Sequence, residues 1–450
     1  MRNLYLSFIL VLIGGVAISQ NTSNSPYSSF GLGEHGGMDH AVFSALGNST
    51  ITMIDSTVLN FYNPSSYSSL SKGQPIFSFG ISSRLSNYSE NGVSSFGNIT
   101  SIQHFAIAFP FAKRFGLAFG LKPYSRRGYE FSSRNAVGED SLYYNYSGSG
   151  GINEAFLGAS VMALNFKGAK ISIGGNAGYL FGNVTNTKKS GLIVSGTDSY
   201  SGGISTKKID TRSFHYELGL HYSQRIKKQH EIGLSAIVEP FQKINGSYED
   251  GLFYSSDIDN HNIFDTLSLN DTLSGNISNV PTYTVGINYN FRFKGRKGQN
   301  NELNSVISAY ASYKESDWSI FENTFEPEFS NTFLKTSKMT FGIQYVPETD
   351  FITNKVVTKF YHRIKYRVGI YQFTLPYQRN GEQVSDFGTT FGFGLPIVVQ
   401  NSLSSINFGF TIGNRGVSDP QVLKEQYYGI NLGISIAPGT DRWFVKRKLN

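Results

Sequence analysis

The sequence predicts an all-β protein, a transmembrane antiparallel β-barrel of about 14 strands with an N-terminal luminal plug. The first supporting observation is a period of two. Between residues 282 and 293, Thr, Gly, Asn and Arg occupy one parity, and Tyr, Val, Ile and Phe occupy the other. A strand places alternate side chains on opposite faces, so one face is apolar and the other is small and polar. Soluble sandwiches favour Lys and Glu on the polar face, whereas this pattern is typical of strands in an outer membrane.

The second observation is that the alternation recurs along the chain. It predicts strands near residues 75–86, 101–111, 114–130, 141–164, 169–183, 210–223, 230–245, 281–293, 304–314, 338–347, 359–374, 384–395, 403–413 and 427–437. The third observation is that short and long connections alternate between these strands. Outer-membrane barrels have short periplasmic turns and longer outer loops, so both ends of the barrel chain belong on the periplasmic side. The longest connections, 246–280 and 315–337, are therefore expected at the cell surface.

The N-terminus predicts export. Arg2 precedes an apolar stretch from Leu4 to Val16, and Ala17-Ile18-Ser19 before Gln20 fits a signal-peptidase site. This stretch is shorter than the roughly 20 residues that a spanning helix needs. We therefore expect a signal peptide at 1–19, a plug segment at 20–74, the barrel at 75–437 and a periplasmic tail at 438–450.

Composition agrees with this class. Charged residues make up 16% of the chain and aromatic residues 14%, whereas soluble domains carry about 25% charged residues. The chain has 0 Cys, so no disulfide framework is available. The net charge of +7 is not gathered into a basic stripe with interleaved aromatic residues, which argues against a nucleic-acid partner.

Residues 20–74 are too rich in Gly and turn residues for a strand. Their length suits a plug inside the lumen. Many Gly fall on the inward parity of the predicted strands, where they leave room for another backbone. These Gly are Gly116, Gly120, Gly174, Gly178, Gly233, Gly286, Gly388, Gly392 and Gly409.

After the last strand, Trp443 and Phe444 stand beside Arg442, Lys446 and Arg447. Aromatic rings at headgroup level with cations beside them predict an interfacial anchor on the periplasmic side.

Three cations, Arg363, Lys365 and Arg367, share one parity of a predicted strand, opposite apolar neighbours. A cation on the lipid face costs roughly 2–4 kcal/mol near the membrane midplane, so these three are expected to face the lumen. Two interpretations are open. The cations pair with inward acids such as Glu217, Glu231 or Glu239 and stiffen the barrel, or they form an electropositive slot for a carboxylate or phosphate headgroup.

Other chemistry is sparse. Asp257 and Asp259 alternate as in Ca²⁺ loops, but His261 stands where a third oxygen ligand belongs, so we expect an outer loop and no metal. Asp265-Thr266-Leu267 and Asp271-Thr272-Leu273 resemble O-glycosylation tripeptides of Bacteroidota. His215 and His221 lie on the polar face without a nucleophile at suitable spacing. We expect no enzyme activity, no catalytic residues and no cofactor.

Short motifs in the N-terminal segment support a family resemblance. Ala45-Leu46-Gly47, Asp55-Ser56-Thr57 and Asn63-Pro64, ahead of a barrel of about 14 strands, resemble the hatch of the FadL family of outer-membrane transporters for fatty acids and hydrocarbons. Ser65 replaces the Ala that usually follows the Asn-Pro step. The resemblance assigns the plug motif to Gly31, Gly33, Asp55, Thr57, Asn63 and Pro64.

The opening residues 25–33 and the Trp443-Phe444 pair resemble the Bacteroidota branch of that family, which includes the barrel that shuttles cargo in type IX secretion. The resemblance implies a location in the outer membrane, with lipid as a partner. It also implies transport of a hydrophobic or amphipathic small molecule. The alternative is a non-enzymatic subunit or carrier barrel of an outer-membrane machine for type IX secretion or barrel assembly, which would bind other outer-membrane proteins.

Overall fold

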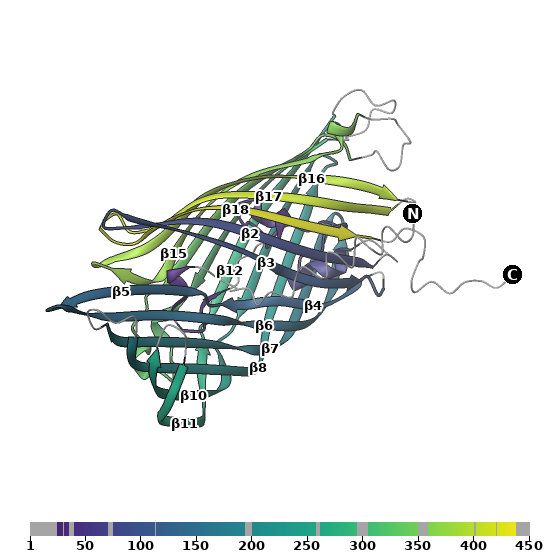
Figure 1. Cartoon of the computed structure of the whole chain (residues 1–450). Coiled ribbons are helices and arrows are strands. Elements are labelled where there is room, and N and C mark those ends of the chain that lie inside the picture. The colour runs from purple at the N-terminus through teal and green to yellow at the C-terminus, as the bar shows by residue number, and fades with distance from the viewer. Residues whose placement is uncertain are drawn as a thin grey trace, which may run out of the picture.

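The computed structural model describes residues 25–29, 31–35, 40–70, 75–112, 114–193, 200–257, 262–294, 305–349, 359–399, 402–419 and 421–437. The strands form one antiparallel sheet that closes on itself, because β18 (Lys424–Ile436) pairs with β2 (Ile76–Glu90). Figure 1 shows the resulting barrel, with strongly tilted strands. No helix in these ranges is both long and apolar enough to cross a membrane.

The barrel wall has 14 strands, as the sequence predicts. Three of them are interrupted: β4 continues as β5, β9 as β10, and β11 as β12, with breaks at residues 127–128, 240–241 and 280–281. Pro240 and Pro281 lie at two breaks, where Pro cannot donate to a ladder. The remaining strands are β3 (Val93–Phe109), β4 (Phe115–Arg126), β5 (Tyr129–Val137), β6 (Asp140–Phe166), β7 (Ala169–Ile193), β8 (Tyr200–Ile226), β9 (His230–Glu239), β10 (Gln242–Asp257), β11 (Asn262–Asn279), β12 (Thr282–Phe293), β13 (Ser305–Ser316), β14 (Thr336–Val346), β15 (Lys365–Arg379), β16 (Glu382–Val399) and β17 (Ser402–Gly416).

The predicted facing of the strands is confirmed. In β8, Phe214, Tyr216, Leu218 and Leu220 are exposed on the outside of the barrel, whereas His215, Glu217 and His221 are buried inside. The outward side chains are large and apolar, which is what a lipid-facing band requires. The barrel is therefore of the outer-membrane type.

Most of the connections predicted as long loops are instead strands, and that part of the prediction is wrong. Residues 246–257 and 262–279 belong to the paired strands β10 and β11, and residues 87–100 lie in the hairpin β2–β3, which turns at Asn91-Gly92. Above the lipid both faces of a hairpin meet water, so the hydrophobic alternation that marks a strand disappears. The connection at 315–337 contains the short helices η3 (Trp318–Ile320) and η4 (Pro327–Phe329).

The N-terminal segment lies within the barrel. It contains η1 (Pro26–Ser29), β1 (Glu34–His35), α2 (Ala41–Ser44) and η2 (Pro64–Ser69), while η5 (Phe360–His362) precedes β15. Most apolar side chains of the N-terminal segment are buried. They pack in one cluster with inward residues of β3, β4 and β6, in one with Tyr310 of β13, and in two others that contain Leu32 and Tyr27. A segment this polar in sequence is ordered by packing against the wall and by its own turns.

Candidate functional site

Inward Gly bring the N-terminal segment against the barrel wall. A Cβ on Gly342 would lie 2.6 Å from the carbonyl oxygen of Leu46, and one on Gly369 would collide with the backbone of Leu46 and Gly47. Gly47 itself has φ of 65° and faces the backbone of Ile370. On the opposite wall Gly116 and Gly174 meet the carbonyl oxygens of Tyr67 and Pro64. Two of these four wall Gly, Gly116 and Gly174, were in the set predicted from the sequence.

An Ala at one of these positions is expected to unseat the segment. Gly369→Ala places a methyl group into the backbone at Leu46 and Gly47, so we expect a loss of about 1–3 kcal/mol in stability, as for other overpacked sites. Proteinase K should cut the segment faster in this variant; trypsin is unsuitable, since residues 25–70 contain no Lys or Arg. Gly429→Ala is the matched control, because its Cβ would meet only Thr411, at 3.3 Å. Equal cleavage of both variants would contradict the close fit.

The predicted plug-motif residues hold the turns of the segment. The Asn63 side chain accepts hydrogen bonds from the Ser65 amide (3.0 Å) and the Ser65 hydroxyl (2.6 Å), which caps η2, and Pro64 is the first residue of that helix. Asp55 caps its own turn by accepting from the amide and the hydroxyl of Thr57, at 2.9 and 2.7 Å. These residues therefore fix the shape of the backbone that packs against the inward Gly of the barrel wall.

Gly31 and Gly33 lie where the segment meets β4. The carbonyl oxygen of Gly31 accepts a hydrogen bond from the buried Arg127 guanidinium. Gly33 has φ of 100° and packs against the carbonyl of Arg126, where a side chain has no space. The next two residues, Glu34 and His35, pair with Arg126 and Ser125 as strand β1.

The predicted basic strip is not a single strip. Lys365 faces the lumen and forms an ion pair of 2.9 Å with Asp55 of the segment, in place of the expected Glu217, Glu231 or Glu239. Arg367 is buried and donates to the side-chain oxygens of Gln344 and Asn407. Arg363 caps η5 and lies before β15, because the strand begins at Lys365, six residues later than predicted.

The Asp55–Lys365 pair predicts a pH dependence. Burial alone would raise the pKa of Asp55. The Lys365 ammonium and the hydrogen bonds from Thr57 outweigh that effect and lower the pKa from 3.8 to about 2. The stability that the ionised Asp55 contributes is present above pH 3.8 and is lost as the pH falls through about 2. Thermal melts followed by circular dichroism should show this loss between these values. Asp55→Asn should remove that part of the dependence, and identical acid profiles for both proteins would contradict the pairing.

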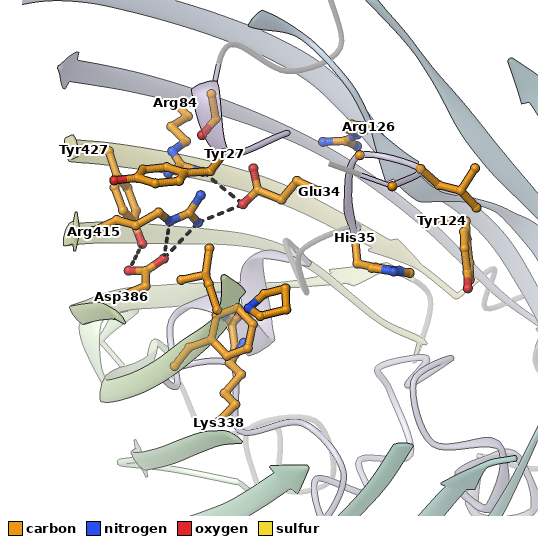
Figure 2. Close-up of a pocket in the computed structure, with 18 of the residues that line it drawn as sticks. Tyr27, Glu34, His35, Arg84, Tyr124, Arg126, Lys338, Asp386, Arg415 and Tyr427 are labelled. Carbon is orange, nitrogen blue, oxygen red and sulfur yellow. Dashed lines mark hydrogen bonds and ion pairs between the residues drawn. The ribbon is translucent and has the colours of Figure 1, made fainter. Parts of the chain in front are cut away.

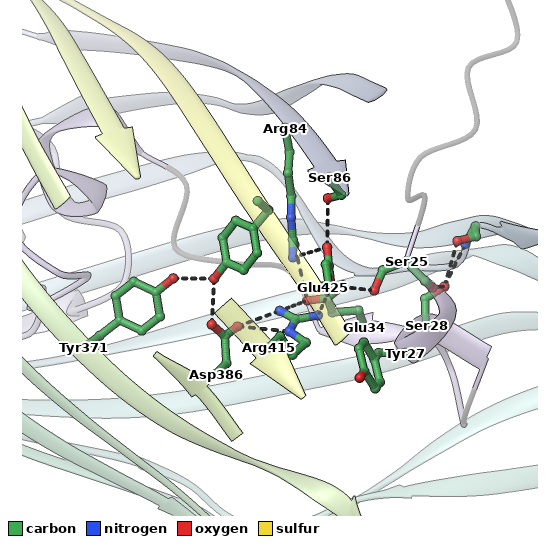
Figure 3. A network of polar contacts seen from close by, with 12 residues as sticks. Ser25, Tyr27, Ser28, Glu34, Arg84, Ser86, Tyr371, Asp386, Arg415 and Glu425 are labelled. Carbon is green, nitrogen blue, oxygen red and sulfur yellow. Dashed lines mark hydrogen bonds and ion pairs between the residues drawn. The ribbon is translucent and has the colours of Figure 1, made fainter. Parts of the chain in front are cut away.

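A larger set of charges joins the segment to the wall formed by β2, β16, β17 and β18. This Arg415 cluster consists of Glu34, Arg84, Asp386, Arg415 and Glu425 (Figure 3). Arg415 lies 2.8 Å from Glu34, 2.9 Å from Asp386 and 3.7 Å from Glu425. Arg84 lies 2.6 Å from Glu425.

Two further contacts extend the Arg415 cluster. The Ser25 hydroxyl donates to Glu425, so two separate points of the segment are held here. Burial alone would raise the pKa of Glu34. The nearby Arg415 and Arg84 guanidinium groups outweigh that effect and lower the pKa to about 2. Glu34 is therefore ionised at neutral pH.

A second set, the Lys122 cluster, crosses the lumen beside the segment. Lys122 lies 3.3 Å from Glu154 and 3.9 Å from Glu217, and His215 lies 3.1 Å from Glu154. Glu239 then links His215 to Lys314. Its members come from five strands, so the cluster ties the wall together across the lumen. The polar parity predicted for His215 and Glu217 is confirmed, but their clustering was not predicted.

A cavity of about 330 Å³ lies beside the Arg415 cluster (Figure 2). Its lining includes an apolar group, Leu32, Ile277, Trp318, Phe321 and Phe333, which pack together. It also includes Glu34, Arg84, Asp386 and Arg415, which belong to one ion-pair cluster, and Arg126. The cavity therefore offers an apolar group and a charged group of side chains to one occupant, and its volume falls at the low end of known ligand pockets.

The wall of the barrel is incompletely paired next to this cavity. β3 and β4 pair only between 105–109 and 117–121, although both strands and β5 extend well beyond those residues. In the gap, Arg126 donates to the carbonyl oxygen of Ile102, and β1 pairs with the freed edge of β4. Gly97, Ile99 and Ser101 of the separated part of β3 line the cavity. The cavity is thus lined by the part of β3 that borders the gap.

Several predicted residues lie outside the described ranges. Trp443 and Phe444, the signal peptide, and Asp259 and His261 belong to this group. Within the described ranges no group of three or more His, Cys, Asp or Glu could hold a metal ion.

Comparisons with known proteins address the family and the fold. The BamG family model matches residues 1–450. A comparison of the sequence with curated proteins gives no match. Among solved structures, the Pseudomonas putida toluene transporter TodX is similar with a TM-score of 0.52 and 14% identity, covering 91% of this chain and 100% of TodX. The CymD monoaromatic hydrocarbon channel is similar with a TM-score of 0.50 and 11% identity, covering 91% and 99%.

At these identities the two structures show a shared fold, the barrel of such channels. The narrower resemblance to the type IX shuttle branch stays a prediction. The match over the whole length is the stronger finding, and the chain belongs to the BamG family.

Proposed function

We propose that this protein is an outer-membrane barrel that takes up a hydrophobic or amphipathic small molecule through the gap between β3 and β4. The observation that carries the proposal is the position of the cavity. Its lining includes Gly97, Ile99 and Ser101, which belong to the part of β3 that has left β4. A molecule dissolved in the outer leaflet could enter the cavity from the side, without passing through the aqueous phase.

The two groups of lining side chains fit such a molecule. Its acyl chain or ring lies against Leu32, Phe321 and Phe333, and its headgroup lies toward the Arg415 cluster. The guanidinium groups of that cluster are shared among three acids, so a headgroup exchanges with existing ion pairs. This exchange couples the occupant to Glu34 and therefore to the N-terminal segment.

The segment acts in this proposal as the plug. It fills the part of the lumen next to β15 and β4 with fully buried side chains, and it is held by Asp55, Glu34 and Ser25. Onward movement of a ligand requires that these contacts loosen. The fold of the TodX and CymD channels, and the resemblance of residues 45–64 to the FadL hatch, support this proposal.

A substitution that fills the cavity tests it. Thr411 lines the cavity on β17, and Thr411→Trp places an indole there. We expect binding of a fluorescent fatty acid to the purified barrel to weaken by at least about tenfold, since steric exclusion of part of the ligand removes more than 1.4 kcal/mol. Ile412→Trp is the matched control, because Ile412 is the next residue and faces lipid. Equal affinity in both variants would place the ligand elsewhere or exclude it.

A second function is supported by the family. The name BamG favours the alternative in which the barrel is a subunit of a barrel-assembly machine. The packed lumen and the long hairpins beyond the lipid band also suit a subunit that docks other proteins. Stoichiometric co-purification with other outer-membrane proteins, from cells solubilised in mild detergent, supports this function. A barrel that purifies alone with bound amphiphile supports the first.

A further inference from the structure

Two strand edges face each other across the gap without a strand between them at their outer ends. β5 pairs with β6 from Tyr129↔Gly148 to Val137↔Asp140, and in the described ranges no other strand pairs with it. β3 pairs with β2 from Val93 onward, but its pairing with β4 begins only at Phe105. Figure 1 shows β3 and β5 diverging toward the end of the barrel opposite the start of β2.

The hairpin geometry determines which backbone groups of β5 point into the gap. Val137 and Asp140 flank a two-residue turn, so they form a hydrogen-bonded pair, and every second residue of β5 bonds to β6 in the same way. The amide of Arg127, on this same parity, donates to the carbonyl oxygen of Gly150 at 3.0 Å. The backbone groups of Glu130, Ser132 and Ala136, on the other parity, therefore point away from β6.

The β5 edge is only partly protected, by the exposed charges of Glu130 and Arg134. Tyr129–Val137 contains no Pro and no Lys, and its register with β6 has no bulge. Residues 130–137 are all exposed, so neither face of the strand is covered. An edge with these properties is a template for another strand.

The edge of β4, which continues into β5, already pairs with the short strand β1. Glu34↔Arg126 and His35↔Ser125 pair antiparallel on the side of β4 that β3 has left. β1 is only two residues long, so the edge above it stays open in the described ranges. The chain itself thus shows that a short extended segment fits in the gap.

We propose that the β5 edge binds an extended segment of a different cell-envelope protein, which runs antiparallel to β5 and adds a strand at the outer end of the barrel. Rows of amide and carbonyl groups recognise another backbone, which is how β-strand addition works. A second copy of this chain is the poorer fit. Two barrels in one membrane have the same orientation, so their β5 strands run parallel and cannot pair antiparallel. This proposal holds whether or not the barrel transports a ligand.

Amide hydrogen exchange tests the edge directly. The barrel is measured in outer-membrane vesicles from its own host and again after purification in detergent. We expect the amides of Glu130, Ser132 and Ala136 to exchange at least about tenfold more slowly in the vesicles, while Phe131 and Ser133 are protected in both. Equal exchange of the even-numbered amides in the two samples would overturn the proposal.

Two variants identify the cause of that protection. Ser132→Pro removes one N–H that points into the gap and leaves the bonds to β6 intact, whereas Ser132→Ala keeps the N–H. In vesicles, Ser132→Pro should abolish the slow exchange at Glu130 and Ala136, and Ser132→Ala should keep it. Protection that survives Ser132→Pro would show that the edge is covered without backbone pairing, which contradicts the proposal.

Cross-linking identifies the occupant. The chain has 0 Cys, so Phe131→Cys gives a single attachment point for a photoreactive probe on β5. The matched control is Leu192→Cys, which is exposed at the same end on β7, a strand paired on both sides. We expect one adduct of defined mass from Phe131→Cys that is lost with Ser132→Pro and absent from the control. An adduct between two differently tagged copies, or one that persists with Ser132→Pro, would overturn the proposal.

Discussion

Deleting residues 25–70 is expected to convert the barrel from a closed to an ion-conducting form. The 14 strands pair in a ring that does not include the segment, so the wall should still close without it. The wall that the deletion uncovers is lined by Gly, Ser, Asn and charged side chains, which water and ions tolerate. Barrels a little wider than this one form open aqueous channels when nothing fills them.

Planar-bilayer recordings measure this effect. The intact protein should give rare, small openings, and the deletion variant should give a steady conductance that scales with salt concentration. Resistance of the barrel to unfolding in cold detergent is the control for correct assembly. A conductance that is the same with and without the segment would show that residues 25–70 do not close the lumen.

Arg415→Met is expected to have the largest effect of any single substitution. Arg415 neutralises Glu34, Asp386 and Glu425 within 3.7 Å, and Asp386 and Glu425 are buried. Removing it leaves carboxylates without a counter-ion away from water, and breaking a buried pair in this way costs about 3–5 kcal/mol. Urea unfolding in micelles should show this loss. Arg415→Lys should recover only part of it, because an ammonium cannot reach several acids with a planar fork.

Arg379→Met is the control for Arg415→Met. Arg379 is exposed at the end of β15, where the loss of a cation is expected to change stability by less than about 1 kcal/mol. If Arg415→Met unfolds at the same urea concentration as the control, the Arg415 cluster does not anchor the segment.

The strand positions in the lipid band could be predicted because they follow from a local rule. Lipid outside and a packed lumen inside impose a period of two on every strand, as in β8. The rule fails above the lipid, where water meets both faces. For this reason β5, and the outer parts of β10 and β11, looked like loops in the sequence.

The functional contacts were harder to predict because they join distant parts of the chain. Glu34 and Arg415 are 381 residues apart, and Asp55 and Lys365 are 310 apart. No local pattern pairs such residues; their meeting depends on strand tilt and on the path of the segment. The same holds for the gap, because whether β3 leaves β4 depends on the twist of neighbouring strands. The inward Gly, and the composition and length of residues 20–74, were the sequence signals that the lumen receives another backbone.

Native mass spectrometry of the barrel, released from outer membranes of its own host in mild detergent, tests the central proposal most directly. The proposal predicts one bound amphiphile per barrel in the wild-type protein and in Ile412→Trp, and none in Thr411→Trp. A wild-type barrel that carries no small molecule, and that is recovered in a fixed stoichiometric complex with other outer-membrane proteins, would contradict uptake of a ligand through the gap and would favour the machine-subunit function.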